Sequence, residues 1–149
     1  MICCDMDGTN VKGYSYLTSK IDSIYHEAAW KCGLSDSAMR ILYVICLHGE
    51  ECRLSEIILL SGISKQTANS ALRKLENEGV LDLEPDRGRA KKVVLTEKGK
   101  RLAENTALKI LQIENRVFGS WTKEEREQYF LLTQKYLSSF KEKMEEAGL

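Results

Sequence analysis

Proline is almost absent from this chain of 149 residues, in which Pro85 is the only one. Because proline interrupts helices and strands, its scarcity favours a mainly helical protein with short connections. Runs of about eighteen apolar residues are also missing, so no transmembrane helix is expected. The start, MICCDMDGTN, carries two acids and lacks the basic-then-apolar order of a secretory signal, so the expected location is the cytoplasm.

Disulfide and metal motifs are missing as well. The cysteines form no C-x-x-C pair, and their odd number is typical of reduced thiols; they are Cys3, Cys4, Cys32, Cys46 and Cys52. Cys46, His48 and Cys52 offer three possible zinc ligands within seven residues. A structural zinc site usually needs four ligands, and Cys46 falls on the inward face of a predicted helix, so no metal is predicted.

The chain has no net charge, but its bases are unevenly spread. Residues 64–101 hold ten lysines and arginines against six acids, an excess of four positive charges, and the rest of the chain has the opposite excess. A local basic segment matters more for binding nucleic acid than the total charge does. The charge pattern therefore directs attention to residues 64–101.

Hydrophobic periodicity predicts the elements of structure. Apolar residues recur at three- and four-residue steps through 14–32, 35–48, 55–60, 64–78, 97–118 and 122–146, which predicts helices. Ser35, Ser64, Thr96 and Thr122 are expected to cap four of them. The period becomes two in 80–84 and 91–96, which predicts two strands joined by a tip, PDRGRA, in which Gly88 supplies a positive φ angle. Residues 1–12 are expected to form a loose tail before a single domain at 13–149.

This order of elements predicts the fold class, which is mainly α. A helix, a glycine turn, a second helix and a two-stranded β wing make a winged helix-turn-helix core at about 34–98. The flanking helices at about 14–32 and 97–146 carry apolar stripes that a core of this size cannot cover. A second copy of the chain can cover them, so these helices are expected to mediate a homodimer.

The helix at 64–77 presents a polar face opposite its apolar side, and the first three turns of the helix carry no acid. Asn and Gln pair with adenine, Arg pairs with guanine, and hydroxyls bind bases or phosphates. The residues predicted to read a major groove are Gln66, Thr67, Asn69, Ser70 and Arg73. Ser64 and Lys65 are expected to contact phosphate at the helix start. The alternative is an ordinary solvated surface.

Arginines also flank the predicted hairpin tip. Arg89, with Arg87 beside it, is expected to enter a narrow minor groove, where the electrostatic potential is most negative. Lys91 is expected to anchor the wing on a phosphate. The alternative is a charged tip that only keeps the hairpin soluble. The predicted partners are therefore double-stranded DNA and a second copy of the chain.

The segment GISKQTANSALRKLENEG, followed by RGRAKKVVLTEKG, resembles the MarR family of transcriptional regulators. The wing of that family commonly reads D-x-R-x-K/R before V-x-L-T-x-x-G. Arg89 and Lys91 fall on its arginine and basic positions, whereas Arg87 stands where the aspartate is usual and Asp86 lies one residue early. This departure bears on the salt bridge with which that aspartate usually orders the wing. The resemblance implies a homodimer with interlocked terminal helices, a palindromic operator and repression tuned by a ligand.

Several alternatives stay open. Some regulators of this family sense peroxide through a cysteine near the first helix, and Cys32 lies at a helix end beside Lys31. Tyr25, His26 and Trp30 could line an effector pocket, although a place in the dimer core or on the surface is favoured for them.

Two other functions are conceivable. A winged helix can instead bind protein partners. Asp5 and Asp7 spell D-x-D-G-T, the motif of haloacid-dehalogenase phosphatases, but only MICC precedes it and no alternation of strands and helices follows. The protein is therefore predicted not to be an enzyme and to need no cofactor.

Overall fold

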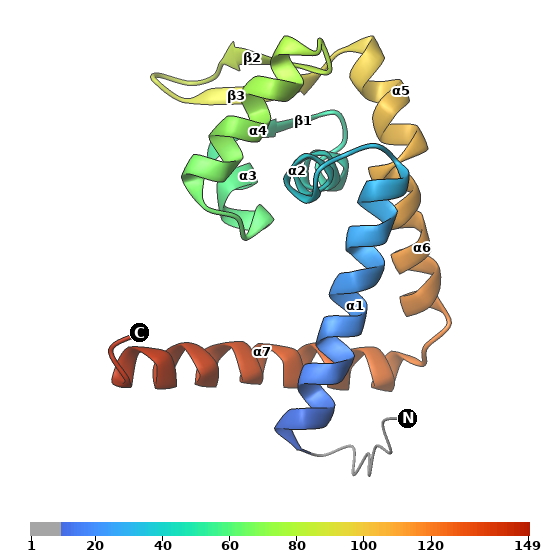
Figure 1. Ribbon diagram of the computed structural model, residues 1–149, viewed down its shortest axis with the longest axis vertical. Coiled ribbons are helices and arrows are strands. Elements are labelled where there is room, and N and C mark those ends of the chain that lie inside the picture. Colours follow the sequence, from blue (N-terminus) through green and yellow to red (C-terminus); the bar gives the residue numbers. More distant parts are fainter. Residues whose placement is uncertain (1–9) are drawn as a thin grey trace. The chain divides into compact units, whose positions relative to one another are not determined.

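A computed structural model describes residues 10–149 (Figure 1). The predicted tail motifs with Cys3, Cys4, Asp5 and Asp7 lie outside the described residues. The described elements are α1 (Val11–Lys31), α2 (Asp36–Leu47), β1 (Glu51–Arg53), α3 (Leu54–Ser61), α4 (Lys65–Asn77), β2 (Leu81–Pro85), β3 (Lys91–Leu95), α5 (Glu97–Asn105), α6 (Ala107–Gly119) and α7 (Lys123–Glu146). They form two compact units, one ending at Leu111 and the other beginning at Gln112. No helix among the described residues is both long and apolar enough to cross a membrane.

Helix starts follow the sequence closely. The side chains of Ser35, Ser64, Thr96 and Thr122 each accept a hydrogen bond from the backbone N–H three residues on, as predicted. At Thr122 the Glu125 carboxylate accepts the Thr122 N–H in return, at 2.8 Å, which completes a capping box. The first helix begins earlier than expected, at Val11, because the Asn10 side chain caps it.

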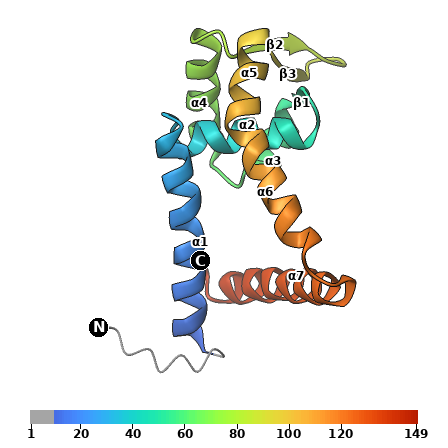
Figure 2. The same cartoon turned by 90° about the vertical axis from the view of Figure 1, so that its right-hand side faces the viewer.

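The sheet has three strands, not the two that the sequence predicts. β1 pairs antiparallel with β3, with Cys52 opposite Val93, so the strand order is β1-β3-β2. A strand of three residues is too short for its period to be recognised in a sequence. Pro85 ends the edge strand β2, where a missing N–H interrupts no inner ladder. The β2–β3 hairpin extends away from the helices around it in both views (Figures 1 and 2).

The predicted helix at 97–118 is divided into α5 and α6. Thr106 separates them with φ −130° and ψ −94°, and its hydroxyl donates a 2.6 Å hydrogen bond to the Leu102 carbonyl. A threonine hydroxyl that binds backbone in this way competes with the regular helix. Neither glycine nor proline marks the break, so the sequence pattern does not show it.

Helix α2 lies at the centre of the first unit. Its fully buried Ile41, Leu42 and Ile45 pack with the buried side of α4, which Ala68, Leu72 and Leu75 supply. The burial of that side turns the opposite face of α4 outward. Gly99 of α5 packs against Val80, which lies between α4 and β2, so closely that a Cβ atom there would lie 1.8 Å from the Val80 carbonyl oxygen.

Candidate nucleic-acid interface

The start of α4 is built by a turn and a cap. Gly62 follows α3 with φ +68°, the left-handed conformation that glycine adopts most easily. Two residues later the Ser64 hydroxyl accepts the Thr67 N–H at 3.1 Å and lies 2.8 Å from the Thr67 hydroxyl. The first turn of α4 contains no acid, so the positive end of the helix dipole is not neutralised by its own side chains.

The outward face of α4 carries polar side chains that are open to a ligand. Lys65, Gln66, Ser70 and Arg73 are exposed, and Asn69 is half-buried. Within residues 10–149, none of these five side chains makes a hydrogen bond or an ion pair. Their donors therefore remain available to a ligand, as the sequence predicts.

The tip of the hairpin is closed by its own backbone. The Asp86 N–H donates to the Ala90 carbonyl at 2.9 Å, and Gly88 has φ +66°, as predicted. Arg87, Arg89 and Lys91 are exposed, and none of the three side chains has an ion-pair or hydrogen-bond partner among the described residues. The wing therefore presents three available cations.

An ion pair also links the wing to the start of α3. The sequence did not decide whether the aspartate of the wing has such a partner. Arg53, at the junction of β1 and α3, places its Nε 3.0 Å from Asp86 Oδ2. The Asp86 side chain is only 19% exposed. The aspartate of the wing is therefore paired although it stands one residue earlier than usual.

Three other lysines within residues 64–101 form ion pairs or hydrogen bonds inside the protein. Lys92 bridges the sheet through Glu51 and Glu84, at 3.2 and 3.8 Å, and its hydrogen bond to Glu51 raises the pKa of the ammonium group. Lys98 donates to the Glu78 carbonyl at 2.6 Å, beyond the end of α4. Lys100 binds Glu50 and Glu97, at 2.9 and 3.2 Å. The lysines near the start of α5 are thus compensated without DNA.

Comparison with known proteins places this interface in a family. Residues 33–92, which contain α4 and most of the hairpin, match the model of the MarR family. The winged-helix core of this chain is therefore similar to the MarR family. No curated protein sequence gives a significant match.

Solved structures of the MarR family share the fold. A regulator from Neisseria meningitidis has a TM-score of 0.73 at 17% identity, over 93% of this chain and 98% of its own. A complex of S. aureus MepR with DNA has a TM-score of 0.70 at 17% identity, over 90% and 99%. Bordetella bronchiseptica BpsR, whose DNA binding 6-hydroxynicotinic acid regulates, has a TM-score of 0.58 at 20% identity, over 82% and 96%. At these identities the likeness concerns the fold.

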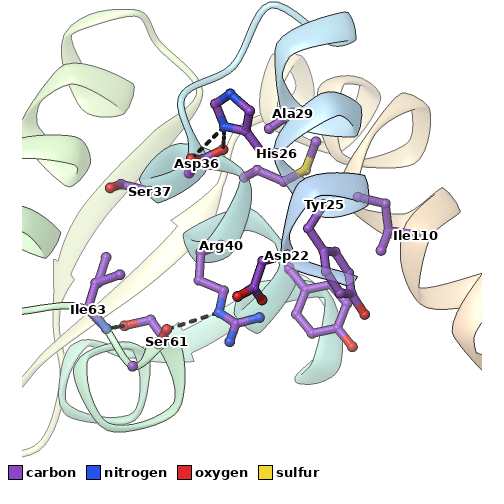
Figure 3. Close-up of a pocket in the computed structure, with 13 residues that line it drawn as sticks. Asp22, Tyr25, His26, Ala29, Asp36, Ser37, Arg40, Ser61, Ile63 and Ile110 are labelled. Atoms are coloured by element: carbon purple, nitrogen blue, oxygen red, sulfur yellow. Dashed lines mark hydrogen bonds and ion pairs between the residues drawn. The ribbon is translucent and has the colours of Figure 1, made fainter. Parts of the chain in front are cut away.

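The first unit also contains a cavity of about 340 Å³ beside α1 and α2 (Figure 3). Tyr25 and His26 line it, with the His26 Nδ1 2.8 Å from Asp36 Oδ2. Trp30 does not line it and is 74% exposed, because it lies on another side of α1. Of the three residues that the sequence suggested for an effector pocket, Tyr25 and His26 therefore line the same cavity.

Two described cysteines, Cys46 and Cys52, are poor candidates for oxidant sensing. Burial raises the pKa of the Cys46 thiol. Burial and the nearby Glu56 carboxylate raise the pKa of Cys52 to about 12. The reactive form of cysteine is the thiolate, so both groups are unreactive at neutral pH. Cys32 is exposed at the end of α1 and stays the described candidate for a sensor.

Proposed function

We propose that this protein is a cytoplasmic, ligand-responsive repressor that binds a palindromic site in double-stranded DNA as a homodimer. The proposal rests on the polar and basic side chains of α4 and of the hairpin that have no hydrogen-bond or ion-pair partner among the described residues. In this arrangement Gln66, Thr67, Asn69, Ser70 and Arg73 read the major groove, and Ser64 and Lys65 contact phosphate. The fold that the chain shares with MepR, which has been solved with DNA, supports the same assignment.

The wing completes the proposed interface. Arg89, assisted by Arg87, enters the minor groove, and Lys91 binds a phosphate of the backbone. The hairpin tip is narrow and carries its cations on the exposed side, which suits insertion into a groove.

The exposed apolar residues support a homodimer. Along α1, Leu17, Ile21 and Ile24 are all about half-exposed or more. Helix α7 has no buried residue at all among its 24, although it carries Phe130, Leu131, Leu132, Tyr136, Leu137 and Phe140. Large apolar surfaces of this kind mark protein interfaces. A two-fold axis would place two copies of α4 about one turn of DNA, roughly 34 Å, apart.

Replacing Arg73 and Lys91 separately with alanine tests the proposal. We expect Arg73→Ala to weaken binding to the DNA upstream of the protein's own gene by about 1–3 kcal/mol and to spare random duplex, because Arg73 reads bases. We expect Lys91→Ala to weaken both duplexes alike and to reduce the salt slope by about one unit, because it contacts phosphate. Titrations at two salt concentrations measure both effects.

Lys109→Ala is the matched control, since it removes an exposed positive charge of α6 and should leave both affinities unchanged. Equal losses on both duplexes for Arg73→Ala and Lys91→Ala would contradict the assigned roles. Wild-type protein whose affinity for DNA does not depend on salt would favour the alternative, a winged helix that binds a protein partner.

The cavity supports a ligand-responsive mechanism. Arg40 lies at its wall with Nε donating to the Ser61 carbonyl at 2.9 Å, and Asp22 also lines the cavity (Figure 3). Tyr25 and Tyr43 supply aromatic surface. A hydroxylated aromatic acid matches these groups, because the acid would pair with the guanidinium, the hydroxyl with the aspartate, and the ring with the tyrosines. Ser61 ends α3, and Gly62 and Ile63 of the turn before α4 also line the cavity, so a bound ligand would contact the segment that positions α4.

Such a ligand should therefore loosen DNA binding. We expect a hydroxylated aromatic acid, with 6-hydroxynicotinic acid as the first probe, to raise the melting temperature and to lower affinity for DNA. Tyr25→Ala should reduce both effects, and Trp30→Ala, outside the cavity, should not. A panel of such acids that shifts neither the melting temperature nor DNA binding would contradict this ligand class.

A further inference from the structure

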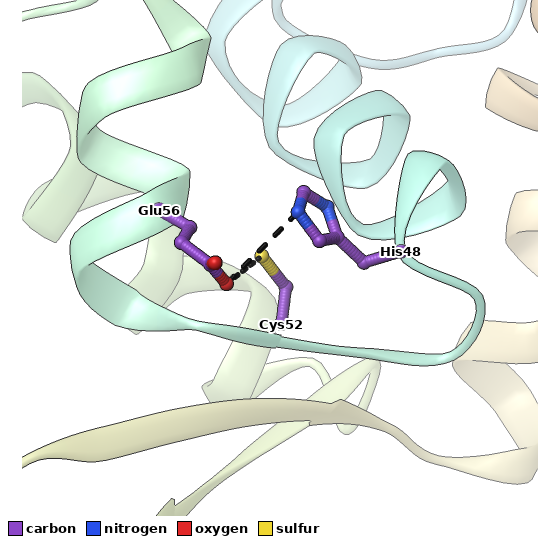
Figure 4. A group of neighbouring side chains, drawn as sticks. All are labelled: His48, Cys52 and Glu56. Carbon is purple, nitrogen blue, oxygen red and sulfur yellow. Dashed lines mark hydrogen bonds and ion pairs between the residues drawn. The ribbon is translucent and has the colours of Figure 1, made fainter.

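Three side chains with metal-binding atoms meet at one edge of the sheet (Figure 4), and none of them lines the cavity. His48 follows the end of α2, Cys52 is the middle residue of β1, and Glu56 lies in the first turn of α3. Their ligand atoms all lie within 4.8 Å of one another. Glu56 Oε2 is 3.7 Å from Cys52 Sγ and 3.9 Å from His48 Nε2. Three elements therefore direct an imidazole, a thiol and a carboxylate to one point.

The imidazole is oriented as a ligand would be. His48 Nδ1 lies 2.9 Å from the Val44 carbonyl oxygen, which can only accept a hydrogen bond, so Nδ1 carries the proton. The lone pair of Nε2 then faces Cys52 and Glu56. Histidines that bind metals usually donate their other ring N–H to a carbonyl or carboxylate in this way.

The carboxylate is oriented too. The Arg53 N–H donates to Glu56 Oε2 at 3.4 Å, which holds the side chain against the start of α3. Two of the three groups are thus fixed by backbone hydrogen bonds, which lowers the entropy lost when a metal binds.

The spacing is close to that of a tetrahedral site. Bonds of about 2.0 Å to nitrogen and oxygen and about 2.3 Å to sulfur put zinc ligands roughly 3.3–3.6 Å apart. The pairs here need to close by about 1.5 Å or less, which small side-chain rotations supply. Cys52 is buried, but the His48 and Glu56 side chains are 29% and 44% exposed, which leaves a path for an ion and a water.

We propose that His48, Cys52 and Glu56 bind a divalent ion of the zinc type through Nε2, Sγ and a carboxylate oxygen, with water as the fourth ligand. Binding releases the thiol proton to solvent and forms a thiolate bonded to the metal. Without metal, burial and Glu56 keep the pKa of Cys52 near 12 and the group protonated. A cation at this point favours the thiolate, because it offsets the charge of Glu56 and bonds directly to the sulfur.

Titration of the reduced, full-length protein with Co²⁺ tests the proposal. We expect one equivalent to give a thiolate-to-cobalt charge-transfer band in the near ultraviolet, and Zn²⁺ to displace it. Cys52→Ser should abolish the band. His48→Gln and Glu56→Gln should weaken the affinity about tenfold or more.

Cys32→Ser and His26→Gln are the matched controls, since each removes the same kind of group elsewhere and should leave the band unchanged. His48 and Glu56 are partly exposed, so their variants should keep the helical circular dichroism of the wild type even where Cys52→Ser fails to fold. Wild-type protein without a band, or a band that survives in His48→Gln and Glu56→Gln at full affinity, would overturn the proposal. The titration contains no DNA, so its outcome is separate from that of the proposed regulation.

Discussion

Replacing Leu137 and Phe140 of α7 together with lysine should convert a dimer into a monomer and lower the affinity for an operator at least 100-fold. The two side chains are 66% and 50% exposed and lie one turn apart on a helix that buries none of its own residues. Burial of a leucine or phenylalanine contributes about 1.5–3 kcal/mol, and a two-fold interface counts each residue twice. A 100-fold loss of affinity corresponds to about 2.7 kcal/mol, within what four such residues supply.

Lysine is the informative replacement because it adds positive charge. A loss of DNA affinity then cannot arise from repulsion between the new side chain and phosphate. Gln128→Lys with Gln134→Lys adds the same charge to exposed polar positions of α7 and serves as the matched control. Light scattering gives the mass in solution, and a duplex titration gives the affinity. A dimeric mass for the Leu137 and Phe140 variant would show that this part of α7 is not the interface.

Gly99→Ala should cost the protein more than about 3 kcal/mol of its free energy of unfolding, a loss typical of severe core disruption. The added Cβ would lie 1.8 Å from the Val80 carbonyl oxygen and 2.9 Å from its carbon, and both are backbone atoms. That oxygen already accepts hydrogen bonds from the Thr96 N–H and hydroxyl, each at 3.1 Å. Relieving the contact would separate the start of α5 from the strand that begins the hairpin.

Gly119→Ala provides the comparison. No atom lies within 4 Å of the position that its Cβ would occupy, and Gly119 does not have a positive φ angle. Alanine should therefore leave stability unchanged or raise it by up to about 1 kcal/mol. Urea denaturation of both variants measures the difference. Similar unfolding midpoints for the two alanine variants would contradict the close approach at Gly99.

The sequence was sufficient where structure is determined locally. The period of α4, its serine cap and the glycine after it come from neighbouring residues, so its outward face could be predicted. The caps of α2, α5 and α7 follow the same logic. The role of each outward residue on DNA stays a prediction.

Features that depend on distant partners were not predictable. Arg53 and Asp86 are 33 residues apart, and only the fold brings them together. Glu56 joins His48 and Cys52 because α3 turns back over β1, whereas the sequence suggested Cys46 as the third ligand. Lys92, Lys98 and Lys100 belong to the base-rich segment 64–101, yet each binds an acid or a carbonyl of the protein.

The pairing of Arg53 with Asp86 has an energetic consequence for docking. Fixing the backbone of a flexible loop costs about 1–2 kcal/mol per residue, and a hairpin tip held at Asp86 by Arg53 and by the Ala90 carbonyl has less of that freedom left to lose. The pairing also masks the one acid of the tip, so no negative charge there opposes the approach of phosphates to Arg87 and Arg89. The tip of the hairpin thus presents its arginines to a groove with less freedom to lose on docking and with no unpaired acid beside them.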